Sequence, residues 1–225
     1  MKKMCKNSLT WEEYWESKLF DTNKYYNIAA SFYRKYIIRE CLNFFIKKFN
    51  TKDAFLLHAG CGSGEVDKEI VREFKVVALD ISPTALRIYN KNNKRVYRTV
   101  SGNILDLPFD EEVFDCIYNL GVMEHFTEDQ IIHILGEFKR VLKKDGKIIL
   151  FWPPEYGLSV IFFKVLFFFT VKVFHKKLFL FPQEITRLKS KHHAKKLVEK
   201  AHLNLAVYYF GIMDIFTHVV LVLKK

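Results

Sequence analysis

The hydrophobic and polar positions of this chain follow two periods. Short apolar runs typical of buried strands are separated by longer segments whose apolar positions recur every three or four residues, as in helices. Strands are expected at 54–59, 75–80, 95–100, 114–120, 147–152, 205–211 and 217–223. Helices are expected at 10–49, 65–74, 82–92, 127–144 and 190–202. This alternation predicts an α/β fold with a mostly parallel, doubly wound sheet.

The chain shows no internal repeat and no flexible linker, so we expect one domain over residues 1–225. Ser82 and Pro83 are typical of a helix N-cap and first helical position, and Asp145-Gly146 marks a turn before a strand. The expected parts are an N-terminal helical lid (1–50), a ligand-binding core (54–154), a hydrophobic insertion (155–182) and a C-terminal helix with a strand pair (183–225).

Composition narrows the class of protein. With 225 residues, 50% of them hydrophobic, the chain can bury the core of an α/β domain. Its four cysteines lie far apart without a CxxC pair, which indicates a reducing cytoplasm and neither a zinc site nor a disulfide framework. The N-terminus lacks an apolar segment, so a cleaved signal peptide is not expected. We therefore predict a cytoplasmic protein without a bound metal.

The net charge of +11 is concentrated near the C-terminus. Residues 155–225 hold 12 Lys or Arg and 4 Asp or Glu, a net charge of +8, which leaves +3 for residues 1–154. Such a basic region can face nucleic acid or an anionic membrane. A pair such as Lys195-Lys196 is equally typical of a helix face in solvent.

Three glycines follow the first expected strand, in the segment HAGCGSGE (58–65). Glycine tolerates positive φ and lets a ligand approach the backbone closely. The dinucleotide fingerprint needs glycine where Glu65 stands, and the Gly-Lys-Ser/Thr of a phosphate-binding loop is absent. Asp80 ends the next strand, where a carboxylate can accept both hydroxyls of a ribose. The loop therefore predicts a nucleoside ligand without phosphates.

Five segments in this order resemble the class I S-adenosyl-L-methionine (SAM)-dependent methyltransferases, of the small-molecule, methyltransferase 11-like type. They are HAGCGSGE (58–65), VVALDIS (76–82), SGNILDLPF (101–109), FDCIYNLGVMEHF (114–126) and RVLKKDGKIILFWPP (140–154). The resemblance covers 54–152 closely and 183–225 in outline. It implies a Rossmann-like, seven-stranded sheet with an antiparallel last strand, and SAM as the cofactor.

The resemblance also implies roles for single residues. The glycine loop would contact the methionine part and ribose, Asp80 would bind the ribose hydroxyls, and Ile81 would pack on the adenine. Asn103 and Ile104 would cover the adenine edge, and the end of the fourth strand would lie beneath the sulfonium and carboxylate. The implied cofactor-binding residues are His58, Ala59, Gly60, Cys61, Gly62, Gly64, Asp80, Ile81, Asn103, Ile104, Leu105, Asn119, Leu120 and Gly121.

Two positions depart from the family pattern. His58 stands where the family usually has Asp or Glu to hold the cofactor's ammonium group. A neutral imidazole can accept one hydrogen bond but brings no negative charge, so affinity would fall unless Glu65 compensates. Asn103 replaces a frequent Asp, and its amide oxygen can still accept from the adenine amino group. A packed histidine and a turn asparagine are the structural alternatives.

Methyl transfer to a hydroxyl or amine can require a base. Glu124 and His125, just past the fourth strand, are the candidates, and His125 suits proton removal near neutral pH. The alternative is that the pair fixes the loop or caps the following helix, with catalysis by alignment alone. The Pro-Pro of WPPEY (152–156) follows the fifth strand rather than the fourth, so methylation of DNA bases is not expected.

Substrate choice is expected to lie outside the core. Aromatic residues of the N-terminal segment are candidates for lining the site: Trp11, Tyr14, Trp15, Tyr25, Tyr26 and Tyr33. The insertion at 157–182 holds eight of the 22 phenylalanines and is too short and interrupted for a transmembrane helix. On a helix, Lys164, Lys172 and His175 fall near one side, as in helices that lie in a membrane interface. The alternative is a helix that caps the site or lies in a homodimer.

The resulting prediction is a methyltransferase for a small-molecule or lipid-like acceptor, cytoplasmic and peripherally bound to membranes if the insertion contacts lipid. It would act as a monomer or homodimer and would not bind DNA. The alternatives are an RNA or protein methyltransferase, suggested by the charge, and an inactive cofactor-binding partner subunit.

Overall fold

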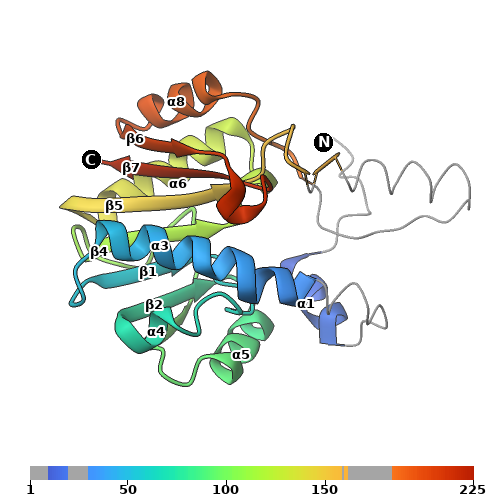
Figure 1. Cartoon of the computed structure of the whole chain (residues 1–225). Helices are drawn as coiled ribbons and strands as arrows, with labels where there is room; N and C mark the ends of the chain where they lie inside the picture. Colours follow the sequence, from blue (N-terminus) through green and yellow to red (C-terminus); the bar gives the residue numbers. More distant parts are fainter. Residues whose placement is uncertain (1–9, 20–29, 159, 162–183) are drawn as a thin grey trace, which may run out of the picture.

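A seven-stranded sheet organises the molecule (Figure 1). The computed structural model describes residues 10–19, 30–158, 160–161 and 184–225. Its strands are β1 (Phe55–Ala59), β2 (Lys75–Asp80), β3 (Arg98–Ser101), β4 (Phe114–Leu120), β5 (Leu142–Trp152), β6 (Asn204–Tyr209) and β7 (Val219–Lys224). The spatial order is β3-β2-β1-β4-β5-β7-β6. The first five strands are parallel and β7 is antiparallel to both neighbours, which confirms the predicted sheet.

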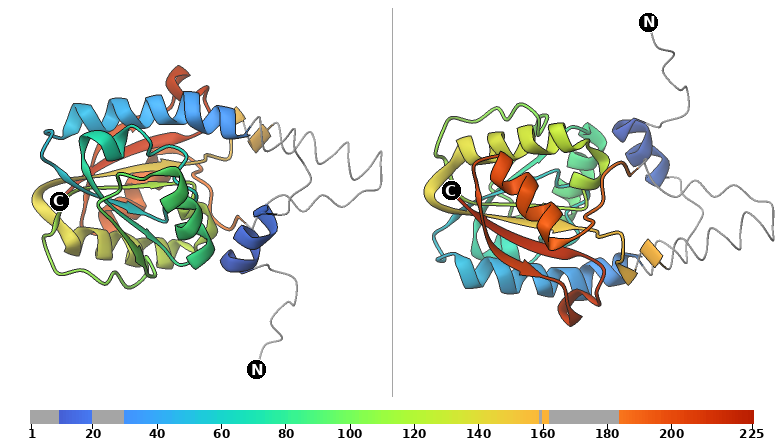
Figure 2. Two further views of the ribbon diagram at one scale, coloured as in Figure 1. Left: turned by 90° about the horizontal axis from the view of Figure 1, so that it is seen from below. Right: turned by 90° about the horizontal axis from the view of Figure 1, so that it is seen from above.

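Helices cover both faces of the sheet, as Figure 2 shows with α3 on one side and α6 on the other. The helices are α1 (Trp11–Leu19), η1 (Arg34–Ile38), α3 (Arg39–Phe49), α4 (Ile70–Glu73), α5 (Pro83–Asn92), η2 (Met123–His125), α6 (Glu128–Val141), α8 (Lys191–Lys200) and η3 (Ile212–Asp214). Four of them begin with a side-chain cap that satisfies a free backbone amide. The capping residues are Thr10 for α1, Ser82 for α5, Thr127 for α6 and Ser190 for α8.

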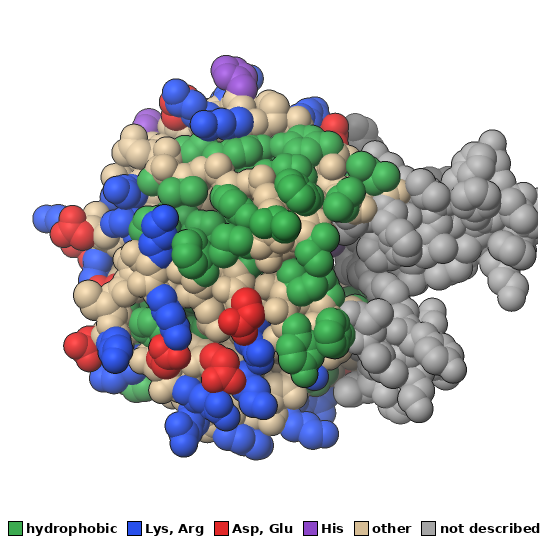
Figure 3. Space-filling model, viewed as in Figure 1, with side chains coloured by type: hydrophobic (Ala, Val, Ile, Leu, Met, Phe, Trp, Pro, Cys, Tyr) green, Lys and Arg blue, Asp and Glu red, His purple; other side chains and the backbone are tan. Residues whose placement is uncertain are grey.

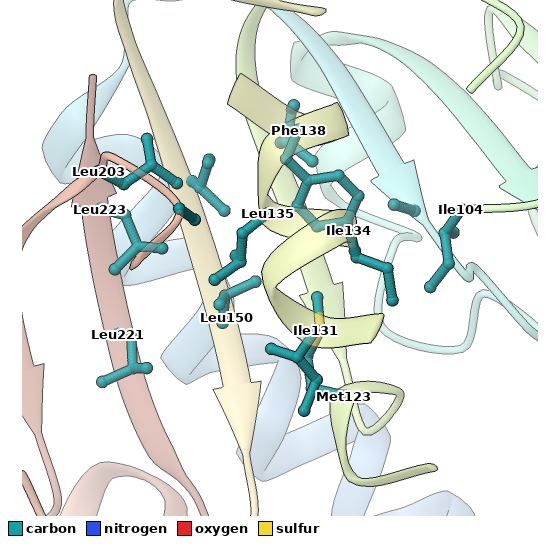
Figure 4. Packing of buried hydrophobic residues seen from close by; sticks show 14 of the residues in the cluster. Ile104, Met123, Ile131, Ile134, Leu135, Phe138, Leu150, Leu203, Leu221 and Leu223 are labelled. Carbon is teal, nitrogen blue, oxygen red and sulfur yellow. The ribbon is translucent and has the colours of Figure 1, made fainter. Parts of the chain in front are cut away.

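The larger hydrophobic core lies between the sheet and helices α6 and α8. Figure 4 shows Ile131 and Leu135 of α6 beside Leu150 of β5, and Ile134 on the side of Ile104. The alternate residues of the strands face α3 and α4, where Leu56, Tyr118 and Phe151 are fully buried. Because the sheet is covered on both faces, its inner strands carry continuous apolar runs, such as residues 76–79 in β2 and 148–152 in β5.

Some element boundaries differ from those expected. The predicted helix 65–74 is reduced to α4, because the amide of Asp67 bonds the Gly64 carbonyl and the chain turns here. The predicted strand 95–100 begins only at Arg98, after a turn closed by Val96 and the carbonyl of Asn93. Helix α6 ends at Val141 rather than near residue 144, since Leu142 already pairs with Phe114. Of the predicted helix 10–49, the described parts form α1, η1 and α3, and residues 20–29 lie outside the described ranges.

Candidate functional site

The glycine loop lies at the carboxyl edge of the sheet, where β1 is flanked by β2 and β4. Gly60, Gly62 and Gly64 have φ values of +71°, +51° and +63°, the left-handed region that favours glycine. The amides of Gly60 and Cys61 both donate to the Leu79 carbonyl, at 2.8 and 2.9 Å. The loop is therefore tied to the end of β2.

The ends of β2 and of the glycine loop share one carboxylate. Asp80 is buried, and its Oδ2 accepts from the Gly62 amide at 2.8 Å while Oδ1 accepts from the Ser82 amide at 2.9 Å. Burial raises the pKa of Asp80, although the hydrogen bonds from the two amides favour the ionised form and partly offset this effect. Each carboxylate oxygen can still accept one further hydrogen bond. The next residue, Ile81, is 50% exposed and offers an apolar surface beside this carboxylate.

The end of β4 supplies a buried amide. Asn119 is fully buried, and its Nδ2 donates to the Ala59 carbonyl at 2.6 Å. Within the described part of the chain, its Oδ1 has no hydrogen-bond partner. Gly121 has a φ of +64° and follows Leu120, which packs in the core on the α3 face. Buried polar atoms without a partner are uncommon, so Asn119 Oδ1 is a place where a ligand donor would be favourable.

His58 does not stand alone at the end of β1. Its Nδ1 lies 2.7 Å from Oδ2 of the fully buried Asp67, which also accepts from the hydroxyl of Tyr89. The His58 ring lies 4.4 Å, between centroids, from the ring of Tyr118. A buried carboxylate, that of Asp67, thus lies against the imidazole of His58.

Asp67 was not among the predicted site residues, although the sequence carries a signal for it. Asp67, Ile70, Val71 and Phe74 recur with helical spacing, so a carboxylate stood among apolar positions. An acidic residue placed on an apolar face needs a buried partner. In the structure that partner is His58.

The structure places the Glu65 side chain against other residues of the protein. Glu65 Oε2 pairs with Arg34 Nε at 2.5 Å, and Oε1 accepts from the Ser31 hydroxyl at 2.6 Å. Desolvation would raise the pKa of Glu65, but the charge of Arg34 and these hydrogen bonds lower it overall. Glu65 therefore attaches the glycine loop to the segment before α3.

The segment after β3 forms a turn. Asn103 Oδ1 accepts from the Leu105 amide at 3.0 Å, and the Asp106 amide donates to the Asn103 carbonyl. The Ile104 side chain packs in the core beside α6 (Figure 4). Asn103 and Leu105 thus leave their outer surfaces for a ligand, whereas Ile104 has only its backbone left to contribute.

The two candidate bases occupy different environments in η2. Glu124 is buried, its Oε2 has no hydrogen-bond partner among the described residues, and burial raises its pKa to about 8. A Cβ added to Gly121 would lie 3.5 Å from Glu124 Oε1, so this carboxyl group adjoins the end of β4. His125 is half-buried and packs edge-on against Trp11, with ring centroids 4.9 Å apart.

Helix α1 lies over this edge. A Cβ added to Gly62 would lie 2.8 Å from Cζ2 of Trp15, so the indole ring covers the glycine loop. Two of the expected lining residues, Trp11 and Trp15, are thereby brought to the site. Tyr33 is placed elsewhere, with its hydroxyl on the Asp214 carbonyl and the Thr217 hydroxyl. Tyr25 and Tyr26 lie outside the described residues.

The described residues contain no group of three or more His, Cys, Asp or Glu side chains that could hold a metal ion. None of their helices is both long enough and apolar enough to cross a membrane.

Comparisons with known proteins agree with this geometry. A family model described as a methyltransferase domain matches residues 57–150. An uncharacterized protein of Methanocaldococcus jannaschii is 32% identical over 176 residues, which make up 78% of this chain and 72% of that protein. A tRNA (carboxymethyluridine(34)-5-O)-methyltransferase of Xenopus tropicalis is 28% identical over 109 residues, 46% of this chain but only 16% of that protein.

Solved structures share the fold. A SAM-dependent methyltransferase from Methanosarcina mazei superposes with a TM-score of 0.62 at 16% identity. The matched residues make up 80% of this chain and 96% of that chain. Magnesium protoporphyrin IX methyltransferase from Synechocystis PCC 6803, solved with bound SAH, superposes with a TM-score of 0.64 at 12% identity. The matched residues make up 92% of this chain and 97% of that chain.

A doubly wound sheet with a glycine loop and a buried carboxylate at its carboxyl edge is the arrangement in which α/β proteins bind nucleosides. The chain belongs to the class I SAM-dependent methyltransferases. It is a SAM-dependent methyltransferase, and its cofactor is SAM.

The residues at the edge fit this cofactor. SAM carries no phosphate, in agreement with a loop that lacks a phosphate-binding lysine. Asp80 keeps acceptor capacity that suits ribose hydroxyls, Ile81 offers an exposed apolar surface that suits an adenine, and Asn119 Oδ1 is an acceptor without a partner among the described residues.

Replacing Asp80 by alanine is expected to weaken SAM binding by roughly 1–3 kcal/mol, because charge-assisted hydrogen bonds to the ribose are lost. Titration calorimetry with SAM and with its demethylated product SAH measures the effect. The matched control is Asp110→Ala, an exposed aspartate beside Phe109 at the opposite edge of the sheet, which should bind like wild type. Equal affinity of Asp80→Ala and wild type would remove Asp80 from the cofactor site.

Proposed function

We propose that this enzyme transfers the methyl group of SAM to an apolar, lipid-like acceptor at the carboxyl edge of the sheet. The proposed cofactor-binding residues are those that the family resemblance implies, with Asp67 supporting His58 from below. The observation that carries the choice of acceptor is the number of exposed apolar side chains around this edge.

When bound, SAM supplies a methyl group that its sulfonium charge activates for in-line displacement. The protein's part is to align the acceptor and exclude water. Trp11 and Trp15 of α1 are placed to cover the site, since they contact His125 and Gly62. Glu124 or His125 is proposed to accept the acceptor's proton.

Exposed apolar side chains gather near this edge. Phe32 and Tyr36 are 59% and 57% exposed, with ring centroids 4.6 Å apart, and Ile212 in η3 is 77% exposed. The amide of Ile185, itself 56% exposed, donates to the Glu124 carbonyl at 2.6 Å. Figure 3 shows the hydrophobic side chains as a band on the face of α3 that reaches the residues drawn in grey. Large exposed apolar patches of monomeric proteins often mark interaction sites.

The net charge of +11 supports contact with an anionic lipid surface, which attracts Lys and Arg residues. The insertion at 157–182 is proposed to add to this contact. Its eight phenylalanines lie outside the described residues. We propose a peripheral and reversible association.

Vesicle flotation tests the proposed contact. Wild type is expected to float with vesicles containing phosphatidylglycerol, less with pure phosphatidylcholine, and less in high salt, since salt screens the charge attraction. The double variant Phe32→Glu, Ile212→Glu is expected to stay in solution, because it removes apolar area worth about 25 cal/mol per Å² and adds negative charge.

The matched control is Tyr97→Glu, which changes a 61% exposed aromatic residue next to β3, at the other end of the strands. It should float like wild type. No flotation of wild type at low salt would end the lipid proposal, and so would equal flotation of the double variant.

Methylation of RNA is the second candidate, favoured by the charge and by the tRNA methyltransferase among the relatives. Incubation with radiolabelled SAM and either a total lipid extract or total RNA separates the two. Label in the chloroform phase supports a lipid-like acceptor, and label in precipitated RNA supports the alternative.

A further inference from the structure

Helix α1 is attached to the core by a carboxylate on its first turn. Glu12 Oε1 accepts from the Thr84 hydroxyl at 2.5 Å, and Oε2 accepts from the Thr84 amide at 3.3 Å and from the Ser82 hydroxyl. These donors form the N-terminus of α5, which favours a negative charge. The hydrogen bonds from Ser82 and Thr84 lower the pKa of Glu12, so it is ionised at neutral pH.

Ser82 links this carboxylate to the proposed ribose site. Its amide donates to Asp80 Oδ1 at 2.9 Å, while its hydroxyl donates to Glu12 and accepts from the Ala85 amide at 3.0 Å. One residue therefore holds the carboxylate of Asp80 on one side and that of the lid helix on the other. A shift of either carboxylate changes the position of the same serine.

The two tryptophans of α1 extend the contact across the edge. Trp15 covers Gly62 at the end of β1, and Trp11 packs on His125 after β4. Glu12 contacts α5, which follows β2. Helix α1 therefore contacts the segments that follow three neighbouring strands, β2, β1 and β4. Such a helix encloses whatever binds between the glycine loop and Asp80.

We propose that Glu12 is a positioning residue that holds α1 closed over bound SAM and SAH, so that lid closure and cofactor retention are coupled through Ser82 and Asp80. The proposal rests on the cofactor site proposed above. Coupling of this kind is reciprocal: if the attached lid retains the cofactor, the bound cofactor must also hold the lid.

Hydrogen exchange and dissociation kinetics test the coupling. In wild type, SAH is expected to slow amide exchange in residues 11–19. In Glu12→Gln that protection should be lost, and the SAH dissociation rate measured by stopped-flow tryptophan fluorescence should rise about tenfold, because a charge-assisted attachment becomes a neutral one. The association rate should change much less, since the open lid does not hinder entry.

Two controls isolate the contact. Glu16→Gln removes the same charge from an exposed position of the same helix and should behave like wild type. Thr84→Val removes the partner hydroxyl, and the double variant Glu12→Gln, Thr84→Val should release SAH no faster than the more affected single variant, because both act through one contact.

An unchanged dissociation rate in Glu12→Gln, or protection of residues 11–19 equal to that in wild type, overturns the proposal. If only the melting temperature changes, Glu12 is a helix cap and nothing more. Calorimetry of SAH binding to wild type distinguishes failure of the proposed cofactor site from failure of the proposed role of Glu12. Absence of SAH binding to wild type refutes the cofactor site itself.

Discussion

Replacing His125 by alanine is expected to lower kcat about 100-fold or more, with SAM affinity within about threefold of wild type, because loss of a general base affects the chemical step and not the cofactor. His125 lies in η2 directly after β4, and its ring is held against Trp11 of the lid helix. This placement brings an imidazole to the edge of the sheet that is proposed above as the place of methyl transfer. Single-turnover kinetics on the first accepted substrate, together with calorimetry, give both quantities.

His125→Asn separates proton transfer from alignment. An asparagine keeps a polar side chain of similar reach but does not titrate, so most activity would survive if His125 only fixes the loop. With a histidine base, kcat/KM should rise with pH as the imidazole loses its proton, and this limb of the pH profile should vanish in both variants. Near-wild-type rates in both would exclude His125 from the mechanism.

The sheet could be predicted because each buried strand carries its own local signal. β1 and β2 are short apolar runs bounded by polar residues, and Ser82-Pro83 marks the start of α5. The left-handed glycines after β1 were predictable for the same reason, since few other residues adopt that conformation.

What the sequence could not reveal depends on contacts between distant segments. Glu65 follows the glycine loop directly, and Arg34, 31 residues earlier, pairs with it. Glu12 and Thr84 are separated by 72 residues and meet only because α1 folds back over α5. Neither pairing leaves a periodic pattern, so local reading of the chain finds the parts of the site but not the contacts that join them.

Glu124 is the second candidate base, and its environment differs from that of His125. Its side chain is buried, with its backbone carbonyl accepting from the amides of Ile185 and Thr186 at 2.6 and 2.9 Å. Burial, with a smaller contribution from the nearby charge of Glu184, raises its pKa from an ordinary 4.5 to about 8. At neutral pH the folded protein therefore holds Glu124 protonated, whereas the unfolded chain ionises it.

This shift predicts the effect of Glu124→Gln on stability. Because the folded pKa lies above the unfolded one, the stability that wild type owes to protonated Glu124 is complete below pH 4.5 and is lost as pH rises towards 8. Within that window the loss is about 1.4 kcal/mol per pH unit. Glutamine stays neutral, so the variant should match wild type near pH 4.5 and exceed it in unfolding free energy by pH 8. Urea denaturation across this range is the measurement, with Glu111→Gln, at an exposed position, as the control.

The same substitution decides whether Glu124 takes part in catalysis. If ionised Glu124 is the base, kcat/KM should rise with pH and level off above the Glu124 pKa of about 8. Glu124→Gln should then lower kcat about 100-fold while it raises the unfolding free energy. Gain of stability with loss of turnover is the pattern of a residue whose burial serves chemistry rather than folding. A variant that is more stable at pH 8 and fully active would leave His125 as the base. Stability curves parallel to wild type would show that Glu124 is ionised in the folded protein.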